Sequence, residues 1–275
     1  MSEELSKIVL VVAGFDPSSG AGVTADLKTI AAHGLYGVSC ITALTVQTTL
    51  GVSKCEAVRP ELIRETLDAL IEDTRPAAVK IGMLGSGQTA AEIADFLKVN
   101  SLRNVVLDPV LRSSSGAELL DEPGLRILRD ELLGIVDVVT PNLAEASVLT
   151  GVPVVNKAGM ERACRDLIKL GARNTVVKGG HLAHPIDVLA TNSPNGSLTF
   201  QHFQNKKIET SSTHGTGCAY STAIACNLAI GRSLAGDDGA VMHARNYVAS
   251  ALSEAYPVGK GTGPINHFPS ARHRA

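Results

Sequence analysis

Residues 7–22 read Lys-Ile-Val-Leu-Val-Val-Ala-Gly-Phe-Asp-Pro-Ser-Ser-Gly-Ala-Gly, and this stretch decides the fold. The run from Lys7 to Ala13 is almost entirely apolar, which is typical of a strand buried on both faces in a parallel sheet. The glycine-rich loop after it leads into a helical pattern that begins near Val23. Strand, loop and helix are the first unit of an α/β pattern that repeats along the chain.

Further runs of the same buried-strand type follow, and amphipathic stretches separate them. The runs are Val38–Val46, Ala77–Ile81, Val105–Leu107, Ile135–Val139 and Thr175–Lys178. One helical face carries Ile63, Leu67, Leu70 and Ile71, and another carries Ala90, Ile93, Ala94 and Leu97. This alternation predicts a mostly parallel sheet with helices on both faces. Two strands flank Asn195-Gly196 within residues 186–208, a hairpin signal that predicts an antiparallel edge.

The composition of the 275 residues favours a soluble globular protein. Hydrophobic residues make up 44% and the formal net charge is −2, which excludes disorder as the main state. The 25 Lys and Arg residues balance 27 Asp and Glu residues and Trp is absent, so the chain lacks the basic field and stacking aromatics of a nucleic-acid binder. No apolar run approaches the roughly 20 residues of a membrane span. Without a linker or repeat, we expect one domain spanning residues 1–275.

The cysteines indicate a reducing compartment. Their number is odd and no CxxC pair occurs, which argues against a disulfide framework or a zinc site. They are Cys40, Cys55, Cys164, Cys218 and Cys226. The acidic N-terminus leads directly into the first strand, so no secretory signal is expected and a cytoplasmic protein is predicted.

The first loop has two interpretations. Gly20, Gly22 and Ala25 fit the G-x-G-x-x-A pattern of dinucleotide-binding proteins. However, the loop is too long for the tight turn, and the second strand ends at Gln47 without an acidic ribose ligand. The favoured interpretation is that the glycines permit a tight loop and close helix packing. A loop directed at a small ligand, with Asp26 one helical turn in, stays open as the alternative.

Two residues after strands are candidates for ligand contacts. The Gln47 amide carries a donor and an acceptor and follows an apolar run, so it can read the edge of a heterocycle or simply cap a loop. Met83 follows the third strand in Lys80-Ile81-Gly82-Met83, where it is either a pliable apolar wall or core filler. Ligands of open α/β sheets bind outside the carboxyl ends of the strands, which is where both residues fall.

Charged residues follow three later strands. A carboxylate at the end of a buried strand, as at Asp108, is costly unless it is paired or binds a metal. Asn142 and Glu145 have the spacing of a capping box, yet Asp108 and Glu145 together would also hold Mg²⁺ with phosphates completing its shell. Lys178, followed by two glycines, is either solvated or placed to reach a nucleotide phosphate.

The most informative motif is Thr213-His214-Gly215-Thr216-Gly217-Cys218, which opens a helix rich in small residues. Its glycine-rich turn presents backbone N–H groups at the positive end of the helix dipole and so forms an anion site. It is not a Walker A loop, because G-x-x-x-x-G-K-[ST] occurs nowhere in the chain. Cys218 falls in the first turn, where the pKa of a thiol can be lowered, and it is a candidate base or polar positioning group for a phosphoryl transfer.

In their order, these motifs resemble the hydroxymethylpyrimidine/phosphomethylpyrimidine kinase family, whose fold is ribokinase-like. The resemblance covers nearly the whole chain. It rests on Ser19-Gly20-Ala21-Gly22 with Asp26, Ile41–Thr45 with Gln47, Lys80–Met83, Asp108-Pro109-Val110, Thr140-Pro141-Asn142 with Glu145, Lys178–His181, His214–Cys218, and the tail motif with Gly261, Gly263-Pro264 and His267-Phe268.

The resemblance implies a three-layer ribokinase-like fold and ATP-dependent phosphorylation of 4-amino-5-hydroxymethyl-2-methylpyrimidine and then of its monophosphate. It assigns the pyrimidine edge to Gln47 and the surrounding pocket to Gly14, Asp26, Val46 and Met83. It assigns the Mg²⁺–phosphate region to Asp108 and Glu145, and the ATP phosphates to Lys178, Asn142, Thr213 and Thr216. It places the anion hole at Gly215–Cys218, including Gly217, with Cys218 where related sugar kinases carry an aspartate base. A homodimer is expected from the family alone.

Two departures from the family pattern fall in loops that the resemblance places around the substrate pocket. Leu111-Arg112-Ser113-Ser114-Ser115 stands where a methionine and often a lysine are usual, which bears on lid contacts and on the second phosphorylation. Gly14-Phe15-Asp16-Pro17 stands where many members have Gly-Ser-Asp, which bears on pocket shape. Three alternatives remain: a pyridoxal or pyridoxine kinase, a binding module without catalysis, and, least supported, a Rossmann dehydrogenase.

Overall fold

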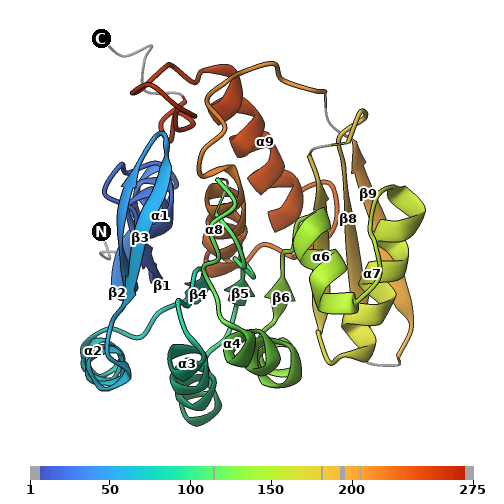
Figure 1. Ribbon diagram of the computed structural model, residues 1–275. Coiled ribbons are helices and arrows are strands. Elements are labelled where there is room, and N and C mark those ends of the chain that lie inside the picture. The colour runs from blue at the N-terminus through green and yellow to red at the C-terminus, as the bar shows by residue number, and fades with distance from the viewer. Residues whose placement is uncertain (1–6, 114, 181, 193–195, 205, 270–275) are drawn as a thin grey trace, which may run out of the picture.

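A nine-stranded sheet forms the centre of the molecule (Figure 1). The computed structural model describes residues 7–113, 115–180, 182–192, 196–204 and 206–269. The strand order is β3-β2-β1-β4-β5-β6-β7-β8-β9. The strands are β1 (Ile8–Phe15), β2 (Tyr36–Thr48), β3 (Gly51–Ala57), β4 (Ala78–Ile81), β5 (Val105–Leu107), β6 (Val138–Val139), β7 (Asn174–Gly179), β8 (Ile186–Asn192) and β9 (Leu198–Gln204).

The six strands from β2 to β7 in the sheet order are parallel, as predicted, and β8 and β9 form the predicted antiparallel edge. Gly196 lies between β8 and β9, whereas Asn195 is outside the described residues. A second antiparallel edge, β3 against β2, was not predicted. The predicted strand Ile135–Val139 was too long, because Ile135 ends a helical turn and only Val138–Val139 pairs with β5.

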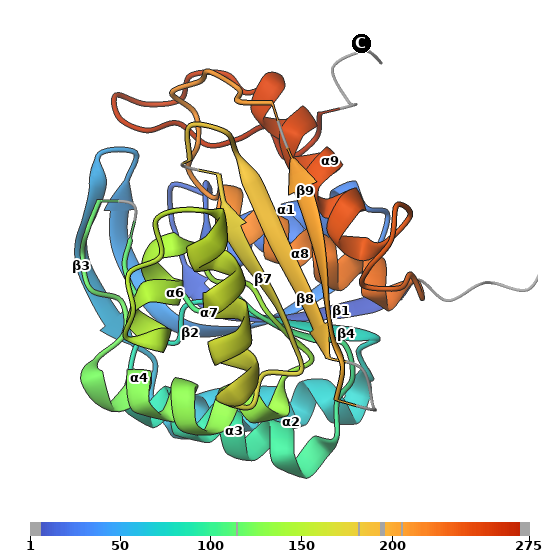
Figure 2. The ribbon, with the colours of Figure 1, turned by 90° about the vertical axis from the view of Figure 1, so that its right-hand side faces the viewer.

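Helices cover both faces of the sheet and give three layers (Figure 2). One face carries α1 (Gly22–Ala32), α8 (Thr216–Ala229) and α9 (Ala240–Ser253). The other carries α2 (Pro60–Asp73), α3 (Gly87–Asn100), α4 (Glu122–Ile127), the π-helical turn η1 (Leu128–Leu132), α5 (Leu133–Ile135), α6 (Leu143–Thr150) and α7 (Lys157–Lys169). The predicted fold class is therefore confirmed.

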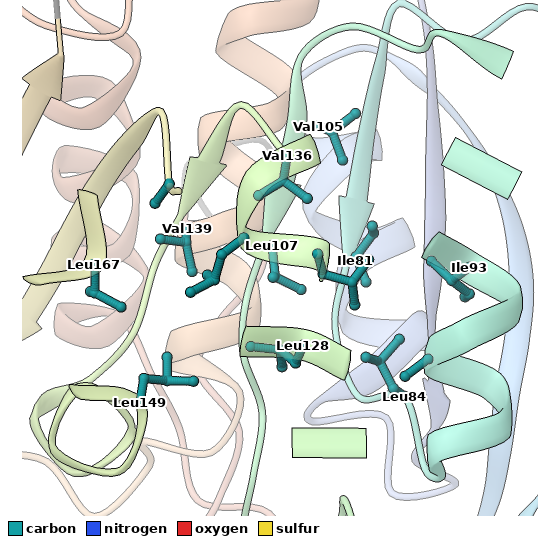
Figure 3. Close-up of a cluster of buried hydrophobic side chains, with 14 of the residues drawn as sticks. Ile81, Leu84, Ile93, Val105, Leu107, Leu128, Val136, Val139, Leu149 and Leu167 are labelled. Carbon is teal, nitrogen blue, oxygen red and sulfur yellow. The ribbon is translucent and has the colours of Figure 1, made fainter. Parts of the chain in front are cut away.

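The apolar run of β1 is continuous because both of its faces are buried. Leu10 and Val12 point into the core under α2–α7, while Val9, Val11 and Ala13 point into the core under α1, α8 and α9. Figure 3 shows the first of these cores, in which Ile81 and Leu107 of the sheet lie near Ile93 of α3 and Leu128. Both predicted helical faces are buried there, Ile63 and Leu67 more deeply than Leu70 and Ile71.

The parallel arrangement brings the residues after β1, β4, β5, β6 and β7 to one edge of the sheet. The N-terminus of α8 lies at the same edge, because a side chain added at Gly217 would meet Lys178 of β7 at 3.4 Å and Asp108, just after β5, at 3.8 Å. In the part of the chain that the structure describes, no helix has both the length and the apolar character needed to cross a membrane.

Candidate active site

A cavity of about 1300 Å³ opens at this edge of the sheet. Twelve of the predicted site residues line it: Gly14, Gln47, Met83, Asp108, Asn142, Glu145, Lys178, Thr213, Gly215, Thr216, Gly217 and Cys218. A smaller open hollow of about 520 Å³, lined by residues between 230 and 238, contains none of them. Most of the predicted site residues therefore line a single cavity.

Asp26 and Val46 do not line this cavity, which differs from the prediction. Asp26 is fully buried in α1, where it pairs with Lys80 Nζ at 2.6 Å and accepts a hydrogen bond from Thr222 Oγ1 at 2.7 Å. Burial alone would lower the pKa of Lys80, but the Asp26 charge holds that pKa above its usual value. Val46 is 58% exposed, because the pleat of β2 points it away from the face that carries Thr45 and Gln47.

A network around Asp16 was not predicted from the sequence. His214 Nε2 lies 2.8 Å from Asp16 Oδ2 and 3.2 Å from the terminal nitrogen of Gln47. Ser18 and Ala21 donate backbone hydrogen bonds to the same carboxylate. Burial alone would raise the pKa of Asp16, but the hydrogen bonds, with that from His214 foremost, hold this pKa below its usual value. Asp16 and His214 are 198 residues apart in the chain, so no local sequence pattern predicts their contact.

Asp108 and Lys178 form a buried ion pair at the centre of the cavity wall. Lys178 Nζ lies 2.7 Å from Asp108 Oδ1, and the two side chains are 14% and 3% exposed. Ser221 Oγ of α8 donates to Asp108 Oδ2 at 3.3 Å. Burial alone would raise the pKa of Asp108, but the charges of Lys178 and Lys80 lower it. Asp108 is therefore ionised at neutral pH.

Glu145 serves a structural role and also faces the cavity. Its carboxylate accepts the Asn142 backbone N–H at 2.8 Å, and the Asn142 side chain accepts the Glu145 N–H at 2.9 Å, so the capping box is confirmed. Burial is the main reason that the pKa of Glu145 is raised to about 7, and the charge of Lys178 opposes that shift. Among the described residues no group of three potential metal ligands occurs, so a cation here would need oxygen ligands from outside the protein.

This pKa makes stability depend on pH. A carboxyl with a folded pKa of about 7 and an ordinary value of 4.5 binds its proton more tightly in the folded state. Stability is therefore expected to fall as pH rises from about 4.5 to 7 and to level off above that range. Glu145→Gln keeps the capping geometry without titrating, and chemical unfolding between pH 4 and 8 is expected to show a flatter profile for this variant. A profile as steep as that of the wild type would assign the dependence to other groups.

The N-terminus of α8 faces the same centre. Gly215 is the N-cap, and within the described residues the backbone N–H groups of Gly217 and Cys218 have no acceptor. A side chain added at Gly217 would point to Lys178 Nζ at 3.4 Å, so the free N–H groups and the ammonium adjoin. This is the predicted anion-binding geometry.

The Cys218 thiol differs from the sequence-based expectation. Burial raises its pKa to about 11, and the opposing charge of Lys80 does not compensate. The expected lowering by the helix N-terminus is therefore wrong, because the cost of desolvating a thiolate beside α8 and the loop at Gly22 outweighs it, although the residue is half-buried and lines the cavity. Cys218 is a thiol, not a thiolate, at neutral pH.

Gly215 is predicted to tolerate no side chain. Its φ is +81°, and a methyl group there would collide with the carbonyl oxygen of Gly20. Gly215→Ala is expected to destabilise the protein by at least about 2 kcal/mol and to abolish most activity, because strain and collision add. Gly231→Ala serves as the control, because Gly231 has a similar φ of +90° but an added methyl group would contact nothing. Its backbone strain alone is expected to cost about 1 kcal/mol. Equal losses in thermal unfolding would show that the contact with Gly20 is unimportant.

The segment after β5 also borders the cavity. Leu111, Arg112 and Ser113 line it, while Ser114 is outside the described residues. Arg112 pairs with Glu118 at 3.2 Å, and Ser115 Oγ accepts the Val52 N–H of β3 at 3.4 Å. The departure from the family pattern therefore falls on the side of the cavity near β3.

Known proteins share both the sequence and the fold. A family model described as phosphomethylpyrimidine kinase matches residues 16–266. The thiamine biosynthesis bifunctional protein ThiED of Geobacter sulfurreducens is 41% identical over 265 residues, covering 96% of this chain and 52% of that protein. The hydroxymethylpyrimidine/phosphomethylpyrimidine kinase of Haemophilus influenzae is 38% identical over 271 residues, 97% of this chain and 98% of its own.

Solved structures agree. Phosphomethylpyrimidine kinase from Clostridium difficile superposes with a TM-score of 0.78 at 35% identity, over 90% of this chain and 99% of its own. Pyridoxal kinase from Staphylococcus aureus in complex with pyridoxal superposes with a TM-score of 0.86 at 28% identity, over 97% of this chain and 95% of its own.

The layers, the strand order and the cavity at the sheet edge define a small-molecule kinase with a ribokinase-like fold. Within that class, the chain belongs to the phosphomethylpyrimidine kinase family.

Proposed function

We propose that this protein transfers the γ-phosphoryl group of ATP to 4-amino-5-hydroxymethyl-2-methylpyrimidine and then to its monophosphate, for thiamine biosynthesis. One observation carries the proposal. The cavity holds an amide that can read a heterocycle, Gln47, together with an anion-binding helix N-terminus and the Asp108–Lys178 pair. The names of the relatives from Haemophilus influenzae and Geobacter sulfurreducens support the same substrates and pathway.

The pyrimidine end of the cavity is assigned to Gln47, Gly14 and Met83. The Gln47 amide pairs with the ring edge through one donor and one acceptor. Met83 covers Gly14, where a side chain would meet the methionine sulfur at 2.8 Å, so the pair forms a close apolar wall for a flat ring. Asp26 and Val46 act indirectly, Asp26 by holding Lys80 and Val46 through its backbone beside Gln47.

The phosphate end is assigned to Lys178, the N–H groups of Gly215–Cys218, and the polar side chains of Asn142, Thr213 and Thr216. Phosphoryl transfer requires mainly positioning and charge neutralisation, which an ammonium and a helix N-terminus supply. The donor set of Asp108 and Glu145 fits Mg²⁺, which prefers oxygen ligands and accepts one or two carboxylates with phosphates. When bound, Mg²⁺ would neutralise charge on the phosphate oxygens.

The reaction needs one proton to leave the hydroxymethyl group. Its oxygen forms a bond to the γ-phosphorus while the bond to the leaving ADP oxygen breaks, and the hydroxyl proton passes to solvent or to a phosphate oxygen. With a pKa of about 11, Cys218 holds its own proton in the resting site. We assign it to hydrogen bonding that orients the hydroxyl, and not to a resting thiolate base.

Pyridoxal is the second candidate substrate. The chain is 28% identical to a pyridoxal kinase whose structure contains pyridoxal, and the two superpose closely. A pyridine with a hydroxymethyl arm has a similar shape to the pyrimidine.

We further propose that residues 1–275 act as one kinase domain in a cytoplasmic homodimer.

The deciding experiment measures ADP release with Mg-ATP and three separate acceptors: hydroxymethylpyrimidine, its monophosphate and pyridoxal. Products are identified by mass. Turnover of both pyrimidines, with pyridoxal much poorer, is expected. Preference for pyridoxal would reassign the substrate, while failure on the monophosphate alone would limit the enzyme to the first phosphorylation. Ligand binding without ADP release would favour the binding-module alternative.

A further inference from the structure

The hydrogen bond between His214 and Asp16 determines where a proton lies. An ionised carboxylate is only an acceptor, so His214 Nε2, at 2.8 Å from Asp16 Oδ2, must carry a hydrogen whether the ring is neutral or charged. The His214 backbone is fixed as well, because its N–H donates to Gly263 O at 3.0 Å and its carbonyl accepts from Ile265. A methyl group on Gly20 would collide with the His214 ring, so the ring also has little freedom to move.

This proton fixes the Gln47 amide. One end of that amide lies 3.2 Å from His214 Nε2, and a donor facing a donor would be repulsive. The amide oxygen is therefore the atom that belongs next to His214, where it shares the single Nε2 hydrogen with the nearer Asp16 oxygen. Nitrogen and oxygen of an amide exchange places by a simple flip. The other end lies 3.2 Å from Thr45 Oγ1, which donates its own hydrogen to Phe15 O at 2.9 Å and so is free to accept. Both contacts favour the same orientation.

We propose that Asp16 and His214 are positioning residues for substrate specificity, whose hydrogen bond holds the Gln47 amide with its oxygen toward His214 and its nitrogen toward Thr45. This inference rests on the proposed function. The chemistry recognised is a ring that carries an amino group beside a ring nitrogen. The amide oxygen accepts from the amino group, and the amide N–H donates to the ring nitrogen.

The orientation has a consequence for catalysis. With the oxygen toward His214, the amino group lies on the side of the residue that directly precedes the anion-binding turn at Gly215–Cys218. In the substrate, the hydroxymethyl carbon is attached next to the carbon that bears the amino group, so the reacting hydroxyl is directed to that turn. The flipped amide would accept the ring in the opposite sense and direct the hydroxyl away.

The test separates productive orientation from binding. His214→Phe keeps a ring but removes the donor, and Gly20→Ala displaces the ring while every hydrogen-bonding group remains. For both variants we expect kcat for hydroxymethylpyrimidine to fall about tenfold, the scale of one net hydrogen bond. The dissociation constant of 4-amino-2,5-dimethylpyrimidine, which lacks the reacting hydroxyl, is expected to change less than about threefold by calorimetry without nucleotide.

Two further variants serve as controls. His214→Gln restores an N–H donor near Asp16 and is expected to recover much of kcat. Ser18→Ala removes only the 2.7 Å hydrogen bond to the other Asp16 oxygen, outside the cavity, and is expected to leave kcat within about twofold. If His214→Phe unfolds, His214→Gln and Gly20→Ala still decide the question.

Three results would overturn the inference: unchanged kcat in His214→Phe and Gly20→Ala, a loss of kcat in Ser18→Ala as large as theirs, or a parallel tenfold loss of dimethylpyrimidine affinity. The last result would make His214 an ordinary binding residue. A wild-type enzyme that phosphorylates neither pyrimidine would instead overturn the proposed function, so the two failures are distinguishable.

Discussion

Replacing Lys178 by methionine is expected to lower kcat about a thousandfold, the largest loss among the changes considered. The ammonium lies 2.7 Å from Asp108 Oδ1 and adjoins the free N–H groups of the α8 N-terminus, so it places a positive charge beside the expected phosphates. Removing one donor from a preorganised anion site commonly costs a hundredfold to a thousandfold. The measurement is ADP release at saturating ATP and hydroxymethylpyrimidine.

The same change removes the partner of a buried carboxylate, so stability needs a separate control. An unpaired Asp108 is expected to destabilise the fold by about 3 kcal/mol. The double variant Lys178→Met with Asp108→Asn removes the uncompensated charge and is expected to recover thermal stability without recovering turnover. Lys178→Arg keeps the charge in a different shape and should be intermediate. Activity of Lys178→Met within tenfold of the wild type would exclude Lys178 from the phosphate site.

Cys218→Ala is expected to lower kcat by at least about a hundredfold, because losing the group that orients the reacting hydroxyl misplaces it relative to the γ-phosphorus. The residue lies in the first turn of α8, between the anion-binding N–H groups and the loop at Gly22. ADP release measures the effect. Near-normal turnover would reduce Cys218 to a packing residue.

Two variants show how Cys218 acts. Cys218→Ser keeps a small hydrogen-bonding group and is expected to retain more activity than Cys218→Ala if orientation is the role, whereas a thiolate base would be lost in both. Cys226→Ala, in the buried part of the same helix, is expected to lose stability and keep kcat.

Iodoacetamide modification of Cys218 in the wild type is expected to accelerate with pH up to about 11, the value to which burial raises its pKa.

The sequence predicted those features that depend on short stretches of chain. The continuous apolar run of β1 indicated a central strand, because only a strand buried on both faces lacks polar alternation. Asn195-Gly196 between two β-rich runs indicated the antiparallel β8–β9 edge. Glu145 three residues after Asn142 gave the capping box, since that contact is local. Parallel strands end at one edge, so Asp108 and Glu145 were expected to lie near each other, and both line the same cavity.

The edge strand β3 was not predictable in this way. It is largely exposed, and it pairs with β2 through backbone hydrogen bonds that leave no apolar period in the sequence. The direction of Val46 follows from the pleat and from a register shift between Val46 and Gln47, which no local pattern reveals. Tertiary structure therefore decided which residues of this hairpin face the cavity.

Long-range contacts and burial decided the chemistry of the site. Asp26 was expected in the pocket, but its pairing with Lys80 requires α1 and β4 to meet and leaves neither charge unpaired. The Cys218 thiol was expected to be acidified by its helix, but desolvation of this half-buried side chain outweighs the dipole, because desolvation acts on the whole charge. The sequence by itself determined the order of strands and helices in the α/β fold and which polar residues follow the strands. Only the tertiary structure decided the protonation states of these side chains, which of them point into the cavity, and the Asp16–His214 contact. Each of these depends on which distant parts of the chain lie next to the group.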